Sequence, residues 1–187
     1  MKLESPLDKL LRKYRINLVL SYVTPDINIC DLGCGANPAL LKHLSNIAAG
    51  KLVGIDRLVP NSAYTKIELR ASDLNQMPLP IHAEEFDLIT MLAVLEHLNN
   101  YHDVIGECSR GLKSGGKLIL TTPSPMSKPL LEFLANLGII SYVGVYDHKK
   151  YFKKDEIFEL LQKHYFTDIR VWNVACGLNT VALATKI

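Results

Sequence analysis

The sequence contains little cysteine, and its cysteines do not form metal or redox motifs. Four occur among 187 residues: Cys30, Cys34, Cys108 and Cys176. None forms a C-x-x-C pair, and no cysteine and histidine stand at the spacing of a zinc site. We therefore expect no metal centre, and four free thiols of the kind that a reducing cytoplasm maintains.

An excess of charge of one sign is also missing. Lysine and arginine together number 21, and aspartate and glutamate 19, so no overall field attracts nucleic acid or an anionic membrane. Two short basic clusters, at residues 9–15 and 149–154, are interpreted as solvated helix faces. The Asn/Asp-Pro-Pro-Tyr signature of nucleic-acid amino methylation is absent as well. Nucleic acid is therefore not the expected partner.

Targeting and membrane signals are lacking too. The first residues carry charges and Pro6 where a secretory signal has an apolar core. Residues 129–146 are strongly apolar, but Glu132 and Gly138 interrupt them, and they fall short of the roughly 20 apolar residues that cross a bilayer. We expect a cytoplasmic protein without a transmembrane segment, either a monomer or a homodimer.

Apolar sequence is abundant, in short runs that alternate with helical patterns. Hydrophobic residues make up 48% of the chain, enough for one core, so residues 1–187 are expected to form a single domain. Strands alternating with helices predict parallel pairing through right-handed crossovers, and hence a doubly wound α/β fold. The expected strands are residues 27–32, 51–56, 67–71, 86–92, 117–121, 166–173 and 179–185, the last two as an antiparallel hairpin at the sheet edge. The expected helices cover residues 7–18, the segment from Pro38 to Gly50, and residues 101–112, 129–138 and 155–163, with a turn at residues 113–116.

Two glycines follow the first expected strand in the pattern of a nucleotide-binding turn. Gly33 and Gly35 let the backbone approach a ligand, and Pro38 suits the first turn of the next helix. A G-x-G turn alone is a weak signal, since an ordinary strand-to-helix turn has it too. Asp56 strengthens it, because it ends the second strand about 20 residues later, where a carboxylate accepts ribose hydroxyls. Asp73 follows the third strand, so these acids share the ligand-binding edge of the sheet.

Taken in order, these motifs resemble the class I S-adenosylmethionine-dependent methyltransferases, especially the small single-domain branch related to the ubiquinone-biosynthesis type. The resemblance covers residues 12–187. It implies a Rossmann-like, mostly parallel seven-stranded sheet, S-adenosylmethionine as cofactor and S-adenosylhomocysteine as product. The matching motifs are Asp31-Leu32-Gly33-Cys34-Gly35, Gly54-Ile55-Asp56, Asp73, Phe86-Asp87-Leu88-Ile89, Leu95-Glu96-His97-Leu98 and Leu112-Lys113-Ser114-Gly115-Gly116-Lys117-Leu118.

For the methionine end of the cofactor, the resemblance implies the loop after the first strand. Gly33 and Gly35 would border this end, and Asp31 would reach its amino group directly or through water. Asn37 stands where the family has a third glycine, and asparagine tolerates left-handed backbone better than most residues. Met91 would help to close the pocket near the sulfonium.

For the nucleoside end, the resemblance implies residues after the second and third strands. Asp56 would hold the ribose, with Arg57 and Leu58 beside the adenine. Asp73 would accept a hydrogen bond from the adenine amine while Leu74 packs nearby.

Two histidines are the candidate catalytic residues, because a base is needed when the accepting atom must lose a proton. By the resemblance, His97 would face the methyl group or the acceptor, and its alternative role is a hydrogen-bonded pocket wall. His148 precedes a helix, and helix-entry packing is its alternative role. Residues 123–154 are expected to cover a small-molecule acceptor of apolar or lipid-like character, and residues 1–24 to form a helical cap. Core packing or a dimer contact is the other interpretation of that insertion.

Two other functions stay open at this point. A cofactor-binding partner protein without catalysis would carry the same motifs, because cofactor binding and acceptor chemistry use different residues. A dinucleotide-dependent oxidoreductase shares the glycine turn and the ribose acid. Against it, Asp31 stands where that fingerprint is apolar, Pro38 replaces its third glycine, and no second domain remains for a substrate.

Overall fold

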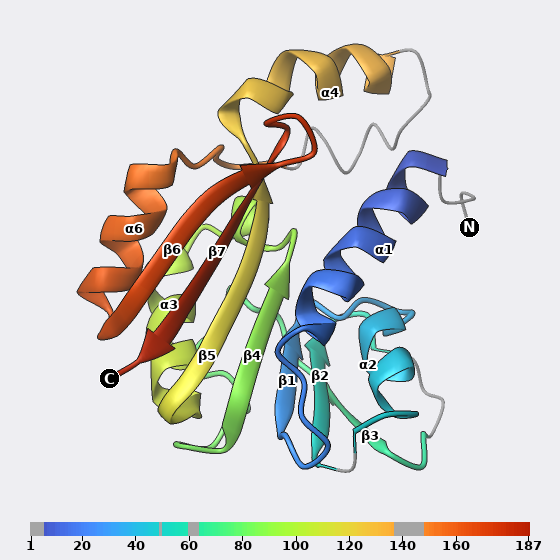
Figure 1. The fold of residues 1–187 in the computed structure, drawn as a ribbon, viewed down its shortest axis with the longest axis vertical. Helices are drawn as coiled ribbons and strands as arrows, with labels where there is room; N and C mark the ends of the chain where they lie inside the picture. Colours follow the sequence, from blue (N-terminus) through green and yellow to red (C-terminus); the bar gives the residue numbers. More distant parts are fainter. Residues whose placement is uncertain (1–5, 49, 60–63, 137–147) are drawn as a thin grey trace.

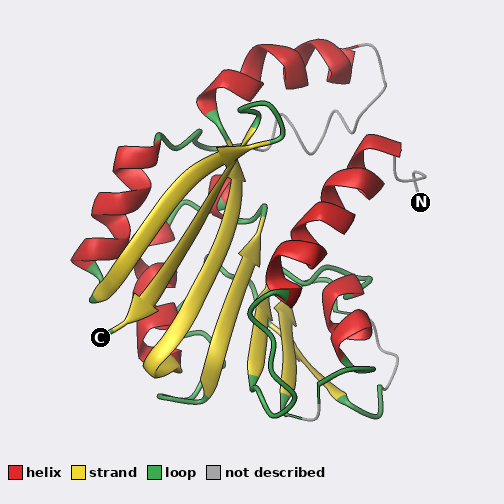
Figure 2. Cartoon of the chain, in the orientation of Figure 1, coloured by secondary structure: helices red, strands yellow, loops and turns green. Residues whose placement is uncertain are grey.

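The fold is a single seven-stranded sheet with helices on both sides (Figures 1 and 2). The structure is a computed structural model, which describes residues 6–48, 50–59, 64–136 and 148–187. The strands are β1 (Ile29–Leu32), β2 (Leu52–Asp56), β3 (Ile67–Ala71), β4 (Phe86–Leu92), β5 (Leu112–Pro123), β6 (Phe166–Val174) and β7 (Asn179–Lys186). They lie in the order β3-β2-β1-β4-β5-β7-β6. β1 to β5 pair in parallel, whereas β7 pairs antiparallel with β5 and β6, so the predicted doubly wound sheet with a C-terminal hairpin is confirmed.

Helices cover both faces of this sheet. Those of the described residues are α1 (Pro6–Leu20), α2 (Ala39–Leu44), α3 (Tyr101–Gly111), α4 (Lys128–Asn136) and α6 (Lys154–Lys163), with short 3-10 helices η1 (Leu95–His97) and η2 (Pro125–Ser127). Neighbouring residues of a strand point to opposite faces. Accordingly Cys30 and Leu32 lie in the core under α3 and α6, and Ile29 in the core under α1 and α2. Because helices bury the side chains on both faces of the sheet, the strand sequences are continuous apolar runs.

One predicted boundary is wrong. The Lys-Ser-Gly-Gly stretch at residues 113–116 was expected to be a turn between α3 and the fifth strand, but it lies within β5. Phe86 pairs with Leu112 and Leu88 pairs with Lys117, so the stretch lies opposite Asp87 alone, as an irregularity in the ladder. Gly115 has a left-handed backbone there (φ 77°), the turn chemistry that the sequence suggested.

The predicted covering insertion is described only in part. After β5 the chain forms η2 and then α4, which lies beyond the carboxyl ends of β4 and β5 in Figure 1. Residues 137–147 of the insertion lie outside the described residues. No helix of the described parts of the chain is both long and apolar enough to span a membrane.

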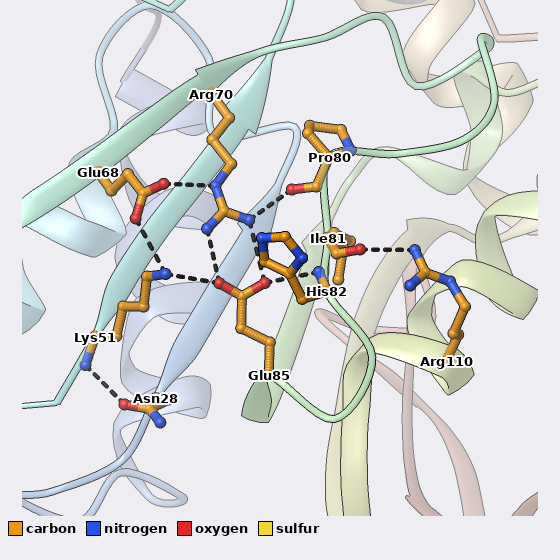
Figure 3. A network of polar contacts seen from close by, with 9 residues as sticks. All are labelled: Asn28, Lys51, Glu68, Arg70, Pro80, Ile81, His82, Glu85 and Arg110. Atoms are coloured by element: carbon orange, nitrogen blue, oxygen red, sulfur yellow. Dashed lines mark hydrogen bonds and ion pairs between the residues drawn. The ribbon is translucent and has the colours of Figure 1, made fainter.

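An ion-pair network joins β3 to the residues just before β2 and β4 (Figure 3). The guanidinium of Arg70 donates to both carboxylate oxygens of Glu85, at 2.7 and 3.2 Å. Lys51 donates to Glu85 at 2.7 Å, and Arg70 also donates to Glu68 at 2.7 Å. The side chains of Arg70 and Glu85 are only 11% and 9% exposed, so little water screens this pair.

The network sets the protonation of Glu85. Burial alone would raise the pKa of this carboxyl, but hydrogen bonds from Arg70, Lys51 and the backbone N–H of His82 outweigh it and lower the pKa to about 2. Because the folded pKa lies below the ordinary value of 4.5, the stabilisation is complete above pH 4.5 and is lost as the pH falls towards 2.

We predict that Glu85→Gln lowers the free energy of unfolding by about 3 kcal/mol at pH 7. The substitution leaves the largely buried Arg70 guanidinium with Glu68 as its remaining carboxylate partner. Urea unfolding of both proteins at several pH values measures this, and the difference should shrink below pH 4.5. The control is Glu84→Gln, whose side chain is 68% exposed and should matter by less than about 0.5 kcal/mol. Equal effects of the two substitutions at pH 7 would contradict the prediction.

Candidate cofactor and active site

A buried carboxylate stands at the end of the central strand pair. Asp31 of β1 lies in register with Thr90 of β4, whose hydroxyl donates to the carboxylate at 2.6 Å. Asp31 is only 5% exposed. Burial raises the pKa of this carboxyl to about 7, the Thr90 hydrogen bond opposes the shift, and the charge of Asp56 adds to it. Such a group binds a cationic partner well, because the partner compensates the charge that burial penalises.

The glycine turn after β1 depends on two left-handed residues. Gly33 has φ 75°, and a Cβ placed on it would lie 2.3 Å from Cγ2 of Val94. Gly35 has φ 69°, but a Cβ on it would meet no protein atom within 4 Å. Gly33 is therefore needed for packing against the loop after β4, whereas Gly35 faces open space suited to a ligand.

Asp56 fixes the turn from the neighbouring strand. One of its carboxylate oxygens accepts the backbone N–H of Gly35 at 3.0 Å, and the other accepts that of Leu58 at 2.7 Å. An ionised carboxylate offers about four acceptor sites, so these two bonds orient Asp56 and still leave capacity for hydroxyl donors.

These groups open onto a cavity of about 300 Å³, which we call the strand-end cavity. Its volume is at the lower end of the usual range for small-molecule sites. It lies at the carboxyl ends of β1, β2, β3 and β4, the expected edge for ligands in this fold. Its lining comprises Gly33, Asp56, Arg57, Leu58, Ser72, Asp73, Leu74, Asn75, Ala93, Val94, His97 and Leu98.

A second cavity of about 230 Å³, the α1 cavity, lies on the other side of Gly33. Helix α1 forms one wall, with Arg12 and Arg15, and the glycine turn forms another. Its lining comprises Leu11, Arg12, Arg15, Ile16, Asp31, Gly33, Cys34, Asn37, Ala39, Leu40 and Leu92. Because Gly33 borders both cavities, one extended ligand could occupy the two.

The structure brings most of the predicted cofactor residues to these cavities. Gly33, Asp56, Arg57, Leu58, Asp73 and Leu74 line the strand-end cavity, and Asp31, Gly33 and Asn37 line the α1 cavity. Gly35 lines neither but holds Asp56 through its N–H. Asn37 does not have a left-handed backbone, so the turn does not need a third glycine at that position.

Met91 lines neither cavity. The sequence placed it at the pocket near the sulfonium, but its side chain is fully buried in the core, with its sulfur 3.8 Å from the thiol of Cys108. The reason is strand alternation, since Met91 points to the face that α3 covers. Ala93 and Val94, which follow β4, line the strand-end cavity instead.

The two predicted catalytic histidines lie next to each other although 51 positions separate them. The ring centroids of His97 and His148 are 4.9 Å apart, with the rings at 63°. His97 lines the strand-end cavity, and His148 Nδ1 is hydrogen-bonded to the Tyr151 hydroxyl at 2.9 Å. Glu96 joins this cluster, and burial raises the pKa of its carboxyl.

Sequence reasoning missed two features of the site. Arg12 and Arg15 belong to the basic cluster that was interpreted as a solvated face, yet both line the α1 cavity. Their spacing by three residues on a helix could have indicated a shared face. Glu96 was noted only as part of a motif, and nothing local in the sequence shows that it is buried beside His148.

The family model described as "Methyltransferase domain" matches residues 7–171. The chain belongs to this methyltransferase family. The predicted membership of a methyltransferase family is confirmed. The oxidoreductase alternative is thereby rejected.

The methyltransferase is similar in sequence to curated ubiquinone biosynthesis O-methyltransferases. It is 28% identical to that of Bartonella quintana over 154 residues, covering 77% of this chain and 62% of the relative. With the protein from Colwellia psychrerythraea, it shares 28% identity over 150 residues, covering 74% and 60%. The chain thus spans about three fifths of these relatives' length.

Solved structures share the fold of the methyltransferase. An S-adenosylmethionine-dependent methyltransferase from Mesorhizobium loti has a TM-score of 0.70 at 15% identity, covering 91% of this chain and 96% of its own. Phosphoethanolamine N-methyltransferase 2 from Haemonchus contortus, in complex with S-adenosylmethionine, has a TM-score of 0.73 at 13% identity, covering 92% and 52%. At such identities the likeness concerns the fold alone.

We predict that Gly33→Ala destabilises the methyltransferase by about 1–3 kcal/mol more than Gly35→Ala does. Both substitutions force alanine into left-handed backbone, at about 1 kcal/mol each, but only the first also collides with Val94. Urea unfolding measures the losses. Combining Gly33→Ala with Val94→Ala should recover part of the loss in a double-mutant cycle. Additive effects would mean that the contact with Val94 does not restrict this position.

Proposed function

We propose that this chain binds S-adenosylmethionine across the two cavities and transfers its methyl group to a small-molecule acceptor. The observation that carries this proposal is the Asp56 carboxylate, held by Gly35 and Leu58 at the strand-end cavity. A carboxylate in this position and orientation suits two neighbouring ribose hydroxyls. The adjoining cavities together offer a polar site at each end of an extended ligand.

The nucleoside would occupy the strand-end cavity. Asp56 would accept the ribose hydroxyl hydrogens, with Arg57 and Leu58 along the adenine. Asp73, which also accepts the N–H of Asn75 at 2.9 Å, would accept a hydrogen bond from the adenine amine, with Leu74 packed beside it. Nothing in this arrangement needs a pyrophosphate site.

The amino-acid end would occupy the α1 cavity. Asp31 is the acid buried there, and an ammonium group would compensate its charge. Arg12 and Arg15 stand on the opposite wall, where a guanidinium suits the cofactor's carboxylate. Gly33 and Gly35 would let the chain of the ligand pass close to the backbone, with Asn37 at the rim of the cavity.

S-adenosylmethionine supplies a methyl carbon that its sulfonium activates, so the protein contributes alignment and exclusion of water. His97 lines the cavity, and its ring contacts that of His148. One of these imidazoles would accept the proton of an acceptor hydroxyl or amine as a general base. Alternatively, the two would hold a cation that favours loss of this proton.

An apolar or lipid-like acceptor is favoured by exposed apolar side chains on the helix that follows β5. Helix α4 exposes Leu130 and Phe133, at 40% and 59%, beyond the carboxyl ends of β4 and β5 (Figure 1). The similar curated proteins are named for ubiquinone biosynthesis. Residues 123–154 would cover the acceptor, although residues 137–147 lie outside the described residues.

The first test is binding and turnover. Calorimetry should detect binding of S-adenosylhomocysteine to the protein, and excess NADH should not displace it. With S-adenosylmethionine, the protein should methylate a member of a panel of phenols, amines and hydroxylated lipids. Binding without transfer to any acceptor would favour the non-catalytic partner protein. Failure to bind the cofactor would reject the proposal.

We predict that Asp56→Ala weakens S-adenosylhomocysteine binding at least about tenfold, equivalent to roughly 1.4 kcal/mol, because the ribose loses its acceptor. Calorimetry measures the change, and thermal unfolding shows whether the variant is folded. Asp26→Ala is the matched control, since Asp26 is exposed before β1 at the far end of the strand. Unchanged affinity in folded Asp56→Ala would remove Asp56 from the site.

We also predict that S-adenosylhomocysteine binds roughly tenfold more weakly at pH 6 than at pH 8. The pKa of Asp31 is raised to about 7 in the free protein, and the ligand's ammonium needs the ionised carboxylate, so lowering the pH through 7 removes the binding form. Asp31→Asn should bind weakly at both pH values and lose this dependence. A wild-type affinity that does not change between them would contradict the role of Asp31.

A further inference from the structure

We propose that Glu96, His97 and His148 bind one divalent transition-metal ion, with zinc as the expected occupant. The three side chains each offer one ligand atom, and these atoms lie within 4.8 Å of one another. Ligands of one zinc ion lie about 2.0–2.2 Å from it and so roughly 3–4 Å apart. Side-chain movements of about an ångström would therefore bring the three ligand atoms to these distances.

Glu96 supplies an independent observation. It is 1% exposed, and neither carboxylate oxygen has a hydrogen-bond partner among the residues that the structure describes. The buried Thr122 hydroxyl is close enough to interact with this carboxylate, but the geometry is too poor for a regular hydrogen bond. A neutral hydroxyl compensates an ionised carboxylate poorly in such a place, whereas a metal ion would supply the missing positive charge.

The backbone holds the two halves of the cluster together. The carbonyl oxygen of Glu96 accepts the N–H of Lys149 at 2.7 Å, which fixes the segment containing His148 against η1. Tyr151 holds His148 through the hydrogen bond to Nδ1, at 2.9 Å. Outer-shell hydrogen bonds of this kind orient metal-binding histidines.

The ligand types select the metal. Two imidazoles and one carboxylate are a nitrogen-rich set, which suits zinc and similar ions better than magnesium or calcium, whose ligands are oxygens. The neighbouring cation Lys150 does not oppose binding, because its ammonium is directed to Glu156 at 2.9 Å. The absence of cysteine spacings typical of zinc sites favoured a protein without a metal, whereas this cluster combines adjacent residues with a histidine 51 positions away.

The ion would lie beside the strand-end cavity, because His97 lines it. Three protein ligands leave zinc a coordination position for water or for an acceptor oxygen. A ring nitrogen bound to the ion cannot also take up a proton, so the two histidines would act as ligands and not as bases. This consequence rests on the proposed function, whereas metal binding itself does not.

The test is a metal titration of the full chain without cofactor. Protein freed of metal with a chelator is titrated with Zn²⁺ by calorimetry and with Co²⁺ by visible absorption. We expect one equivalent to bind, with cobalt d–d bands typical of nitrogen and oxygen ligands, and excess Mg²⁺ should not displace it. Zn²⁺ should also raise the melting temperature.

Glu96→Gln and His148→Asn should each weaken Zn²⁺ binding at least about tenfold and abolish the shift in melting temperature. Glu96→Gln should fold, because it removes only a buried charge. The matched control is His102→Asn, from the exposed pair in which His102 and His164 lie 3.2 Å apart. The proposal would be overturned if the wild-type protein bound no stoichiometric Zn²⁺, or if both site variants bound Zn²⁺ as tightly as the wild type. Loss of binding in His102→Asn alone would also overturn it. Because cofactor binding is measured separately, either proposal can fail alone.

Discussion

The site depends on one pair of hydrogen bonds, those that the Asp56 carboxylate accepts from the backbone of Gly35 and Leu58. They join the end of β2 to the turn that follows β1, so two parallel strands present their loops in a fixed relation. The turn can take part only because Gly33 and Gly35 are left-handed and because no Cβ separates Gly33 from Val94. A carboxylate held in this way needs no reorganisation when a ligand arrives.

The two ends of the sheet are built for different purposes. Away from the glycine turn, the charges of Arg70, Glu85 and Lys51 satisfy one another and support folding. At the carboxyl ends, Asp31 and Glu96 are buried acids, and burial raises the pKa of each carboxyl. Groups that burial perturbs in a cavity are typical of functional sites, where a ligand provides the compensation.

Much of this architecture could be predicted from the sequence, because its signals are local. Short apolar runs located the strands, and the turn at Gly33 and Gly35 with Asp56 located the cofactor edge. The failures have physical reasons. In a strand that is buried on both faces, apolar character does not show to which face a side chain points. The sequence therefore could not show that the Met91 side chain lies in the core. A bulge in β5 was taken for a turn, because Gly115 supplies the same left-handed backbone to either.

Other parts of the site could not be predicted because they arise from contacts between distant segments. The two arginines of α1 line a cavity only because of how that helix packs over the glycine turn. The measurement that tests the central claim most directly is a crystal structure with S-adenosylhomocysteine. We expect the ribose on Asp56, the amino group on Asp31 and the ligand crossing Gly33 from the strand-end cavity to the α1 cavity. A nucleoside bound away from Asp56, or an amino-acid end outside the α1 cavity, would contradict it.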